Sequence, residues 1–176
     1  VYNLYNPRHA ADDHRNQKAS DPEYKQAVSI DFAEAGLPAG VKCAVFDFWQ
    51  NKVVAYAQDS YTTEALPGLS SRLLRFTPLV AAQADVPVLV GSNLHLARGA
   101  TEIANSAATT TSLKLELTDA GAQAGSLTLY STKPLAAVNA ENCEIVSVES
   151  AGENLWQVNL AGRQWGTAQS LTLKIK

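Results

Sequence analysis

The chain has 176 residues, 46% of them hydrophobic, and a formal net charge of −3 at pH 7. This length accommodates one large or two small domains, and the apolar fraction is that of an ordinary globular core. The positive charges are scattered rather than gathered into a basic face, which argues against nucleic acid and anionic membranes as partners. The longest apolar runs, such as Pro87–Val90, are far too short to span a bilayer.

The chain begins at Val1, contains no Met and opens on a strand-like run, VYNLYN. We therefore expect it to be the C-terminal part of a longer protein, so the missing signal peptide says nothing about the parent. The location of that parent is left unassigned, with a bacterial periplasmic or extracellular one slightly favoured over the cytoplasm. Cys43 and Cys143 lie in strand-like apolar runs and fit no metal motif. We predict free, buried thiols, with a disulfide joining the two halves as the alternative.

Strands are predicted throughout the first half of the chain. The hairpin Val41–Ala57 is the clearest element, because two β-type runs flank the turn-prone pair Gln50-Asn51. Around it we expect a long polar loop at 8–26, one helical turn at 33–36 and four further strands. Those strands are Tyr2–Asn6, Val28–Phe32, Ser60–Leu66 and Arg72–Thr77.

Alternation divides the first strand of this hairpin into two faces. One face carries Ala44, Phe46 and Phe48, and the other carries Val45, Asp47 and Trp49. Phe46 and Phe48 are the expected core residues. If they are, Asp47 and Trp49 remain available for a partner surface.

An alanine-rich stretch between Pro78 and Pro87 marks the expected junction of two β subdomains, 1–80 and 86–176. Strands recurring about every 8–12 residues, with turn signals and no useful helical stripe, predict an all-β fold of antiparallel, Greek-key-like sandwiches. The apolar runs expected as strands in the second half are Val88–Val90, Leu94–Leu96, Leu113–Leu117, Leu127–Leu129, Ile145–Val148, Trp156–Leu160 and Leu171–Ile175.

No residue pattern predicts an active site. The polar loop of His9, Asp12, Asp13 and His14 is the nearest approach to a metal cluster, but a solvated loop is the simpler interpretation. Two carboxylates facing each other could cleave a glycoside, yet none of the scattered acids has a neighbourhood that marks it. The acids considered are Asp31, Glu34, Asp47, Glu64, Glu102 and Glu116. We therefore predict no catalytic residue, no metal and no cofactor.

Exposed aromatic rings are the remaining candidates for function, since a flat ring suits the C–H face of a sugar. Trp156 alternates with Val158 and Leu160, which favours a place in the core. Trp165 lies in the turn 162–166, where exposure and burial are equally compatible with the sequence. Asp47, Trp49 and Trp165 are the candidates for contacts with carbohydrate or with another domain.

The first 80 residues contain an ordered series of short motifs. Asn6-Pro7 ends the first strand, and VSIDFAEAGLPAG, VFDFWQNKVV and SRLLRFTP follow. This order resembles the C-terminal antiparallel β-domain of α-galactosidase (melibiase)-type glycoside hydrolases. The matching positions are Asn6, Ile30–Phe32, Ala35–Leu37, Asp47, Trp49 and Leu74–Pro78. The chain departs from the family at Gln50-Asn51, where Thr-Gly is common, and in its enlarged loop 8–26.

The resemblance implies a retaining glycoside hydrolase whose catalytic carboxylates lie in an upstream (β/α)8 domain of the same polypeptide, so none carries over to this chain. The chain itself would be a non-catalytic accessory domain that packs on the barrel and borders the sugar site. Residues from 87 onward resemble a further β module sometimes appended there. Two alternatives remain, an autonomous carbohydrate-binding module with coplanar exposed aromatics and a free-standing enzyme with converging carboxylates.

Overall fold

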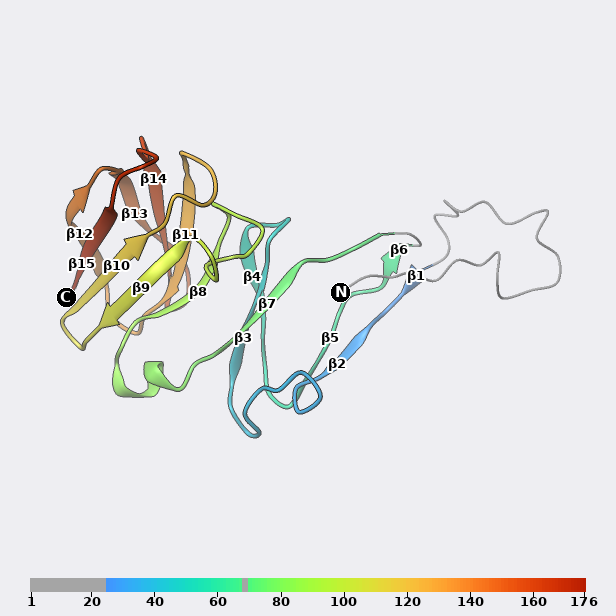
Figure 1. Ribbon diagram of the computed structural model, residues 1–176. Coiled ribbons are helices and arrows are strands. Elements are labelled where there is room, and N and C mark those ends of the chain that lie inside the picture. Colours follow the sequence, from blue (N-terminus) through green and yellow to red (C-terminus); the bar gives the residue numbers. More distant parts are fainter. Residues whose placement is uncertain (1–24, 68–69) are drawn as a thin grey trace, which may run out of the picture.

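The computed structural model describes residues 25–67 and 70–176, and it confirms an all-β, antiparallel fold consistent with a β-sandwich (Figure 1). The described helical structure is a single 3-10 turn, η2 (Ala81–Ala84). A bilayer-spanning helix would need far greater length and apolar character than any helical segment in these residues has. The expected strand Tyr2–Asn6 and the loop of His9, Asp12, Asp13 and His14 lie outside the described residues.

The described part of the first half forms a three-stranded sheet and two short two-stranded pairings, together called the ribbon. The sheet has the order β4-β3-β7, made of β4 (Lys52–Ala57), β3 (Cys43–Asp47) and β7 (Leu74–Pro78). In the ribbon, β2 (Ser29–Asp31) pairs with β5 (Ser60–Thr62), and β1 (Lys25–Gln26) pairs with β6 (Leu66–Pro67). The ribbon strands are short and largely exposed, whereas every residue of β3 is buried.

The second half forms two four-stranded sheets that pack face to face. One has the order β13-β14-β11-β8 and the other the order β12-β15-β10-β9. Their facing leucines, valine and isoleucine form the larger core of the molecule. The strands are β8 (Val88–Ser92), β9 (Ile103–Ala108), β10 (Ser112–Leu117), β11 (Gly125–Tyr130), β12 (Leu135–Glu141), β13 (Glu144–Gly152), β14 (Leu155–Ala161) and β15 (Gln169–Ile175).

The sheet β4-β3-β7 lies against the outer face of the sheet that contains β8. Ala44, Leu79 and Ala82 form a buried cluster with Val90 of β8 and Leu155 of β14. The molecule is therefore layered, with the C-terminal sandwich, the three-stranded sheet and the ribbon following one another in Figure 1. Hydrophobic contacts therefore join the two halves.

Strand β3 alternates as the sequence predicts, but both of its faces are covered. Its first face points toward the C-terminal sandwich, where the Phe46 ring is fully buried. On its second face, Val45 pairs with Phe76 of β7, whose ring contacts Phe32 edge-on at 5.3 Å. Asp47, on this second face, is only 1% exposed. The expectation that Asp47 is exposed is therefore wrong, because the ribbon and the loop that leads into β7 cover that face.

The remaining side-chain predictions have mixed outcomes. Cys43 and Cys143 are both free, as predicted, although Cys143 is only half-buried. Phe46 belongs to the core, but Phe48 is half-buried because it lies in the turn after β3. Trp156 is partly buried against the C-terminal core, where its indole N–H donates to the Ser131 carbonyl at 3.3 Å.

Candidate functional site

A polar cleft of about 360 Å³ opens between the three-stranded sheet and the ribbon. The sheet contributes Asp47 at the end of β3 and Lys52 at the start of β4, and the turn between them contributes Gln50. Tyr61 of β5 and the following Glu64 line the ribbon side. Among the described residues, this end of the sheet face is the part where the cleft opens.

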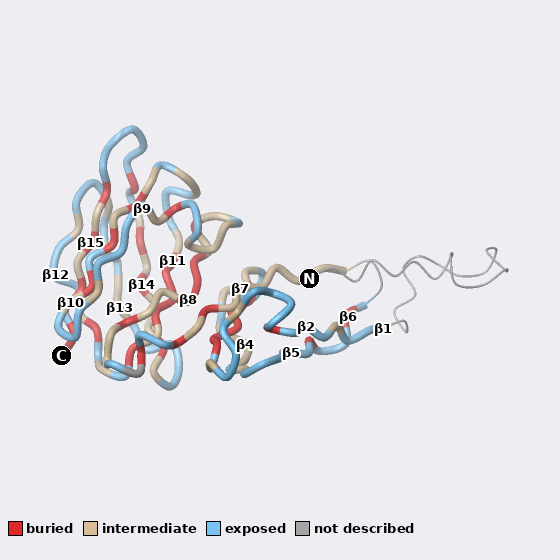
Figure 2. The backbone as a smooth tube through the Cα atoms, turned by 60° about the horizontal axis from the view of Figure 1, so that its bottom comes forward, coloured by how far each residue is buried: buried red, intermediate tan, exposed pale blue. Residues whose placement is uncertain are grey.

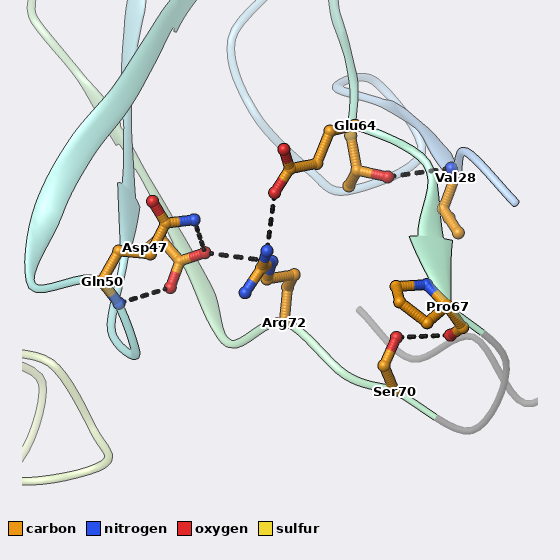
Figure 3. Close-up of polar contacts among 8 residues, drawn as sticks. Val28, Asp47, Gln50, Glu64, Pro67, Ser70 and Arg72 are labelled. Carbon is orange, nitrogen blue, oxygen red and sulfur yellow. Dashed lines mark hydrogen bonds and ion pairs between the residues drawn. The ribbon is translucent and has the colours of Figure 1, made fainter. Parts of the chain in front are cut away.

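Arg72 joins the two sides of the cleft, as Figure 3 shows. Its Nε lies 3.5 Å from Asp47 Oδ2, and its Nη2 donates to Glu64 Oε1 at 2.6 Å. The Asp47 side chain is 2% exposed, that of Arg72 27% and that of Glu64 67%. The row of charges therefore runs from the floor of the cleft to its rim.

The Asp47 carboxylate is held by the turn that follows it. It accepts hydrogen bonds from the Gln50 backbone N–H at 3.0 Å and from Gln50 Nε2 at 3.3 Å. Asn51 closes the turn with φ of 49°, a left-handed conformation that asparagine tolerates well. Because a buried carboxylate is costly unless it is paired and hydrogen-bonded, these contacts explain how Asp47 stays in place.

Tyr61 provides the aromatic wall of the cleft. Its ring contacts Phe76 edge-on, with centroids 5.9 Å apart, so the sheet fixes the ring orientation. Burial, followed by the nearby carboxylates of Asp47 and Glu64, raises the pKa of the Tyr61 hydroxyl. The hydroxyl therefore remains protonated and able to donate a hydrogen bond at neutral pH.

The two tryptophan candidates are both exposed but belong to different parts of the fold. Trp49 is 55% exposed in the β3–β4 turn, where its ring packs edge-on against Phe48 at 5.1 Å. Trp165 is 60% exposed in the loop between β14 and β15. Figure 2 shows how the exposed turns are distributed around the buried strands. Of the three candidates for contacts with carbohydrate or another domain, Asp47 alone lines the cleft, and Glu64 is the second of the acids considered from the sequence that lies there.

The other acidic candidates do not gather into a catalytic pair. Asp31 caps the turn after β2, accepting from the backbone N–H groups of Ala33 and Glu34. Glu102 is fully buried and accepts from the Gly99 N–H, and Glu116 pairs with its strand neighbour Lys114 at 3.1 Å. Within residues 25–67 and 70–176, no group of three or more His, Cys, Asp or Glu side chains could hold a metal ion.

The sequence matches no protein-family model and no curated protein. The cleft and its chemistry therefore have to be interpreted from this chain alone. Two acids, two basic groups, an amide and a phenol in the lining can hydrogen-bond a polar ligand.

Sequence reasoning identified Asp47 but missed Arg72 and Tyr61. Arg72 lies beyond the turn that ends the ribbon, 25 positions from Asp47, so no local pattern connects the two residues. Tyr61 alternates with Ser60 and Thr62 in a short strand, and this alternation is the signal in the sequence for an inward-facing side chain. Pairing of β2 with β5 is what turns Tyr61 toward the sheet.

Proposed function

We propose that this chain is a non-catalytic accessory β-domain of a larger glycoside hydrolase of the α-galactosidase type. Its partner would be a (β/α)8 catalytic domain that precedes it in the same polypeptide. The order of motifs in residues 1–80 supports this proposal, and the all-β fold is compatible with it.

The main structural support is the exposure of the ribbon and of Trp49 in the described part of the first half, 25–67 and 70–85. Among the described residues, all of β1 and the outer residues of β2 and β5 are exposed, and the ribbon has two strands at each level. Two-stranded ribbons are only marginally stable by themselves in water. Trp49 exposes 55% of its surface on the same half of the molecule. A neighbouring domain packed here would cover an aromatic ring and support the ribbon.

A direct test is the coding sequence upstream of this chain, which should encode a barrel with paired carboxylates. The isolated chain should show no turnover of aryl galactosides. Measurable hydrolysis by the purified chain, or an upstream sequence without a barrel, would refute the accessory role.

A substitution then tests the contact between domains. In the full-length enzyme, Trp49→Ala should lower the melting temperature of the barrel, with little change in KM. Trp165→Ala is the matched control, because Trp165 is equally exposed but lies on the C-terminal sandwich. Equal effects of the two substitutions would place the contact elsewhere.

A carbohydrate-binding module is the second candidate, and the exposure of Trp49 and Trp165 favours it. Such a module needs two or three exposed rings in one plane or groove. The two tryptophans lie in turns of different sheets, which makes this the weaker proposal. Calorimetric titration with galactosides and polysaccharides separates the two, since a micromolar Kd would favour the module.

A further inference from the structure

We propose that the polar cleft between the three-stranded sheet and the ribbon binds a single neutral sugar ring. The residues that line the cleft support sugar binding by themselves, and only the choice of galactosides as first probes rests on the proposed function. Neither the barrel contact nor the exposed tryptophans are needed for it.

The charges that line the cleft favour a neutral ligand. Asp47 and Glu64 supply two negative charges, and Lys52 and Arg72 supply two positive charges, so the formal charges cancel. Arg72 is in contact with both carboxylates. A ligand that carried its own charge would leave one charge of the cleft without compensation, which is costly in a partly buried site.

The hydrogen-bonding groups suit vicinal hydroxyls. A carboxylate presents two adjacent acceptors, a guanidinium two adjacent donors and an amide one of each, and neighbouring hydroxyls on a sugar can engage both atoms of such a pair. Glu64, Arg72 and Gln50 provide one group of each kind around the opening. Tyr61 adds an aromatic ring, which suits the C–H groups of a sugar, and a protonated hydroxyl.

The site is organised before any ligand arrives. Asp47 is almost fully buried and holds both Gln50 and Arg72, while Phe76 fixes the Tyr61 ring. Little side-chain entropy is therefore lost on binding. The volume of about 360 Å³ lies at the lower end of the usual range for ligand pockets, which favours one ring over an oligosaccharide.

The experiment is a titration of the 15N-labelled chain with methyl α-galactopyranoside, followed by amide chemical shifts. We expect saturable shifts at Gln50, Tyr61 and Glu64, with a Kd on the order of 1–10 mM for so small a ligand. Methyl glucoside and methyl mannoside define the preference among neutral sugars. Galacturonate and galactosamine test the charge argument, and both should bind more weakly than the neutral galactoside.

Glu64→Gln is the informative variant, because its exposed side chain can change without unfolding the chain. It should weaken binding roughly fivefold to tenfold, since it replaces a charged hydrogen-bond acceptor by a neutral one. Glu116→Gln, an exposed glutamate of the C-terminal sandwich, should leave the Kd unchanged. Thermal melts of both variants confirm that they are folded.

Three results would overturn the proposal. The first is the absence of saturable shifts for every neutral sugar up to about 100 mM, a concentration tenfold above the weakest expected Kd. The second is tighter binding of galacturonate or galactosamine than of the neutral galactoside. The third is a set of shifts confined to the indole groups of Trp49 and Trp165. The first of these leaves the accessory role untouched, because that role is tested by turnover and by the upstream sequence.

Discussion

Arg163 is one of the largest fully buried side chains in the described part of the chain. Its Nε donates to Gln169 Oε1 at 2.9 Å, and Nη1 donates to the Ala122 carbonyl at 2.7 Å. Nη2 donates to the carbonyls of Thr118 and Ala120 at 2.6 and 3.1 Å. Burial lowers the pKa of the guanidinium, but these four acceptors compensate its charge. At the residue scale, this side chain ties the loop after β10 to the last two strands.

Replacing this guanidinium should be among the most damaging single changes in the chain. Arg163→Met leaves several buried acceptors unsatisfied, so we expect a loss of about 3 kcal/mol or more in the free energy of unfolding. Urea denaturation of the variant and the wild type measures this change in the free energy of unfolding. Lys114→Met, at an exposed surface lysine, should change stability by less than about 0.5 kcal/mol. Similar values for both variants would contradict this role of Arg163.

Asp85 gives the fold a pH-dependent contact. It ends η2 and binds the turn between β11 and β12, with Lys133 Nζ at 2.9 Å and Thr132 Oγ1 at 2.8 Å. The hydrogen bond from Lys133, and then that from Thr132, lowers the pKa of Asp85 below its usual 3.8. Because the folded-state pKa is the lower one, the contact stabilises above about pH 4 and is lost as the pH falls through that pKa.

The corresponding measurement is thermal unfolding of the wild type and Asp85→Asn between about pH 7 and pH 2. Asp85→Asn should melt slightly lower at neutral pH, and the difference should close in acid. Added salt should also reduce the difference, since the pair is exposed. A difference that stays constant over the whole pH range would show that the charge of Asp85 is not responsible.

At the scale of elements, β3 is the centre of the first half because it is paired on both sides and covered on both faces. Its neighbour across the interface is β8, where Gly91 lies directly against the Phe46 ring. A Cβ atom at position 91 would be 2.3 Å from Phe46 Cγ. Arg75 of β7 adds polar contacts across the same interface, donating to the carbonyls of Arg98 and Leu89.

Gly91→Ala should therefore separate β3 from β8. We expect a destabilisation of about 1–3 kcal/mol, because the ring cannot yield without disturbing a packed interface. The double variant Gly91→Ala with Phe46→Leu should be less destabilised than the sum of the two single variants, since the smaller side chain makes room for the methyl group. Strict additivity in denaturant unfolding would mean that the two positions are not coupled.

At the scale of the whole molecule, the two halves are unequal. The C-terminal strands enclose a continuous leucine-rich core between two four-stranded sheets. The first half has a small core of its own around Phe32 and Phe76 and shares its second cluster with β8 and β14. The C-terminal sandwich therefore has the means to fold alone, whereas the first half depends on its neighbours.

Expressing the halves separately tests this difference. Residues 86–176 should give dispersed amide signals and a cooperative melt, at a lower temperature than the intact chain because Val90 and Leu155 lose their cover. Residues 1–85 should show no cooperative transition. A folded N-terminal fragment, or an unfolded C-terminal one, would reverse this assignment.

Pattern reading located most strands but not their limits. Alternating leucines placed β10, β11 and β15, because leucine at every second position marks the face of each strand that packs into the sandwich core. It missed β9 and β12, because their mostly small residues do not alternate between large apolar and polar side chains. It also expected a strand at Leu94–Leu96, where the chain instead bends after β8. Burial against a neighbour, and not local pattern, decides these segments.

The hairpin of β3 and β4 shows most clearly which features follow from the sequence and which depend on the tertiary structure. Alternation alone determined that Phe46 and Asp47 face opposite sides, since side chains on a strand must alternate. Only the tertiary structure decided that both sides are buried, because the C-terminal sandwich covers one and the ribbon with Arg72 covers the other. Alternation is a property of the backbone, whereas burial depends on which distant segments pack against it. Asp47 therefore lies on the floor of a polar cleft while Trp49, two residues later, remains exposed.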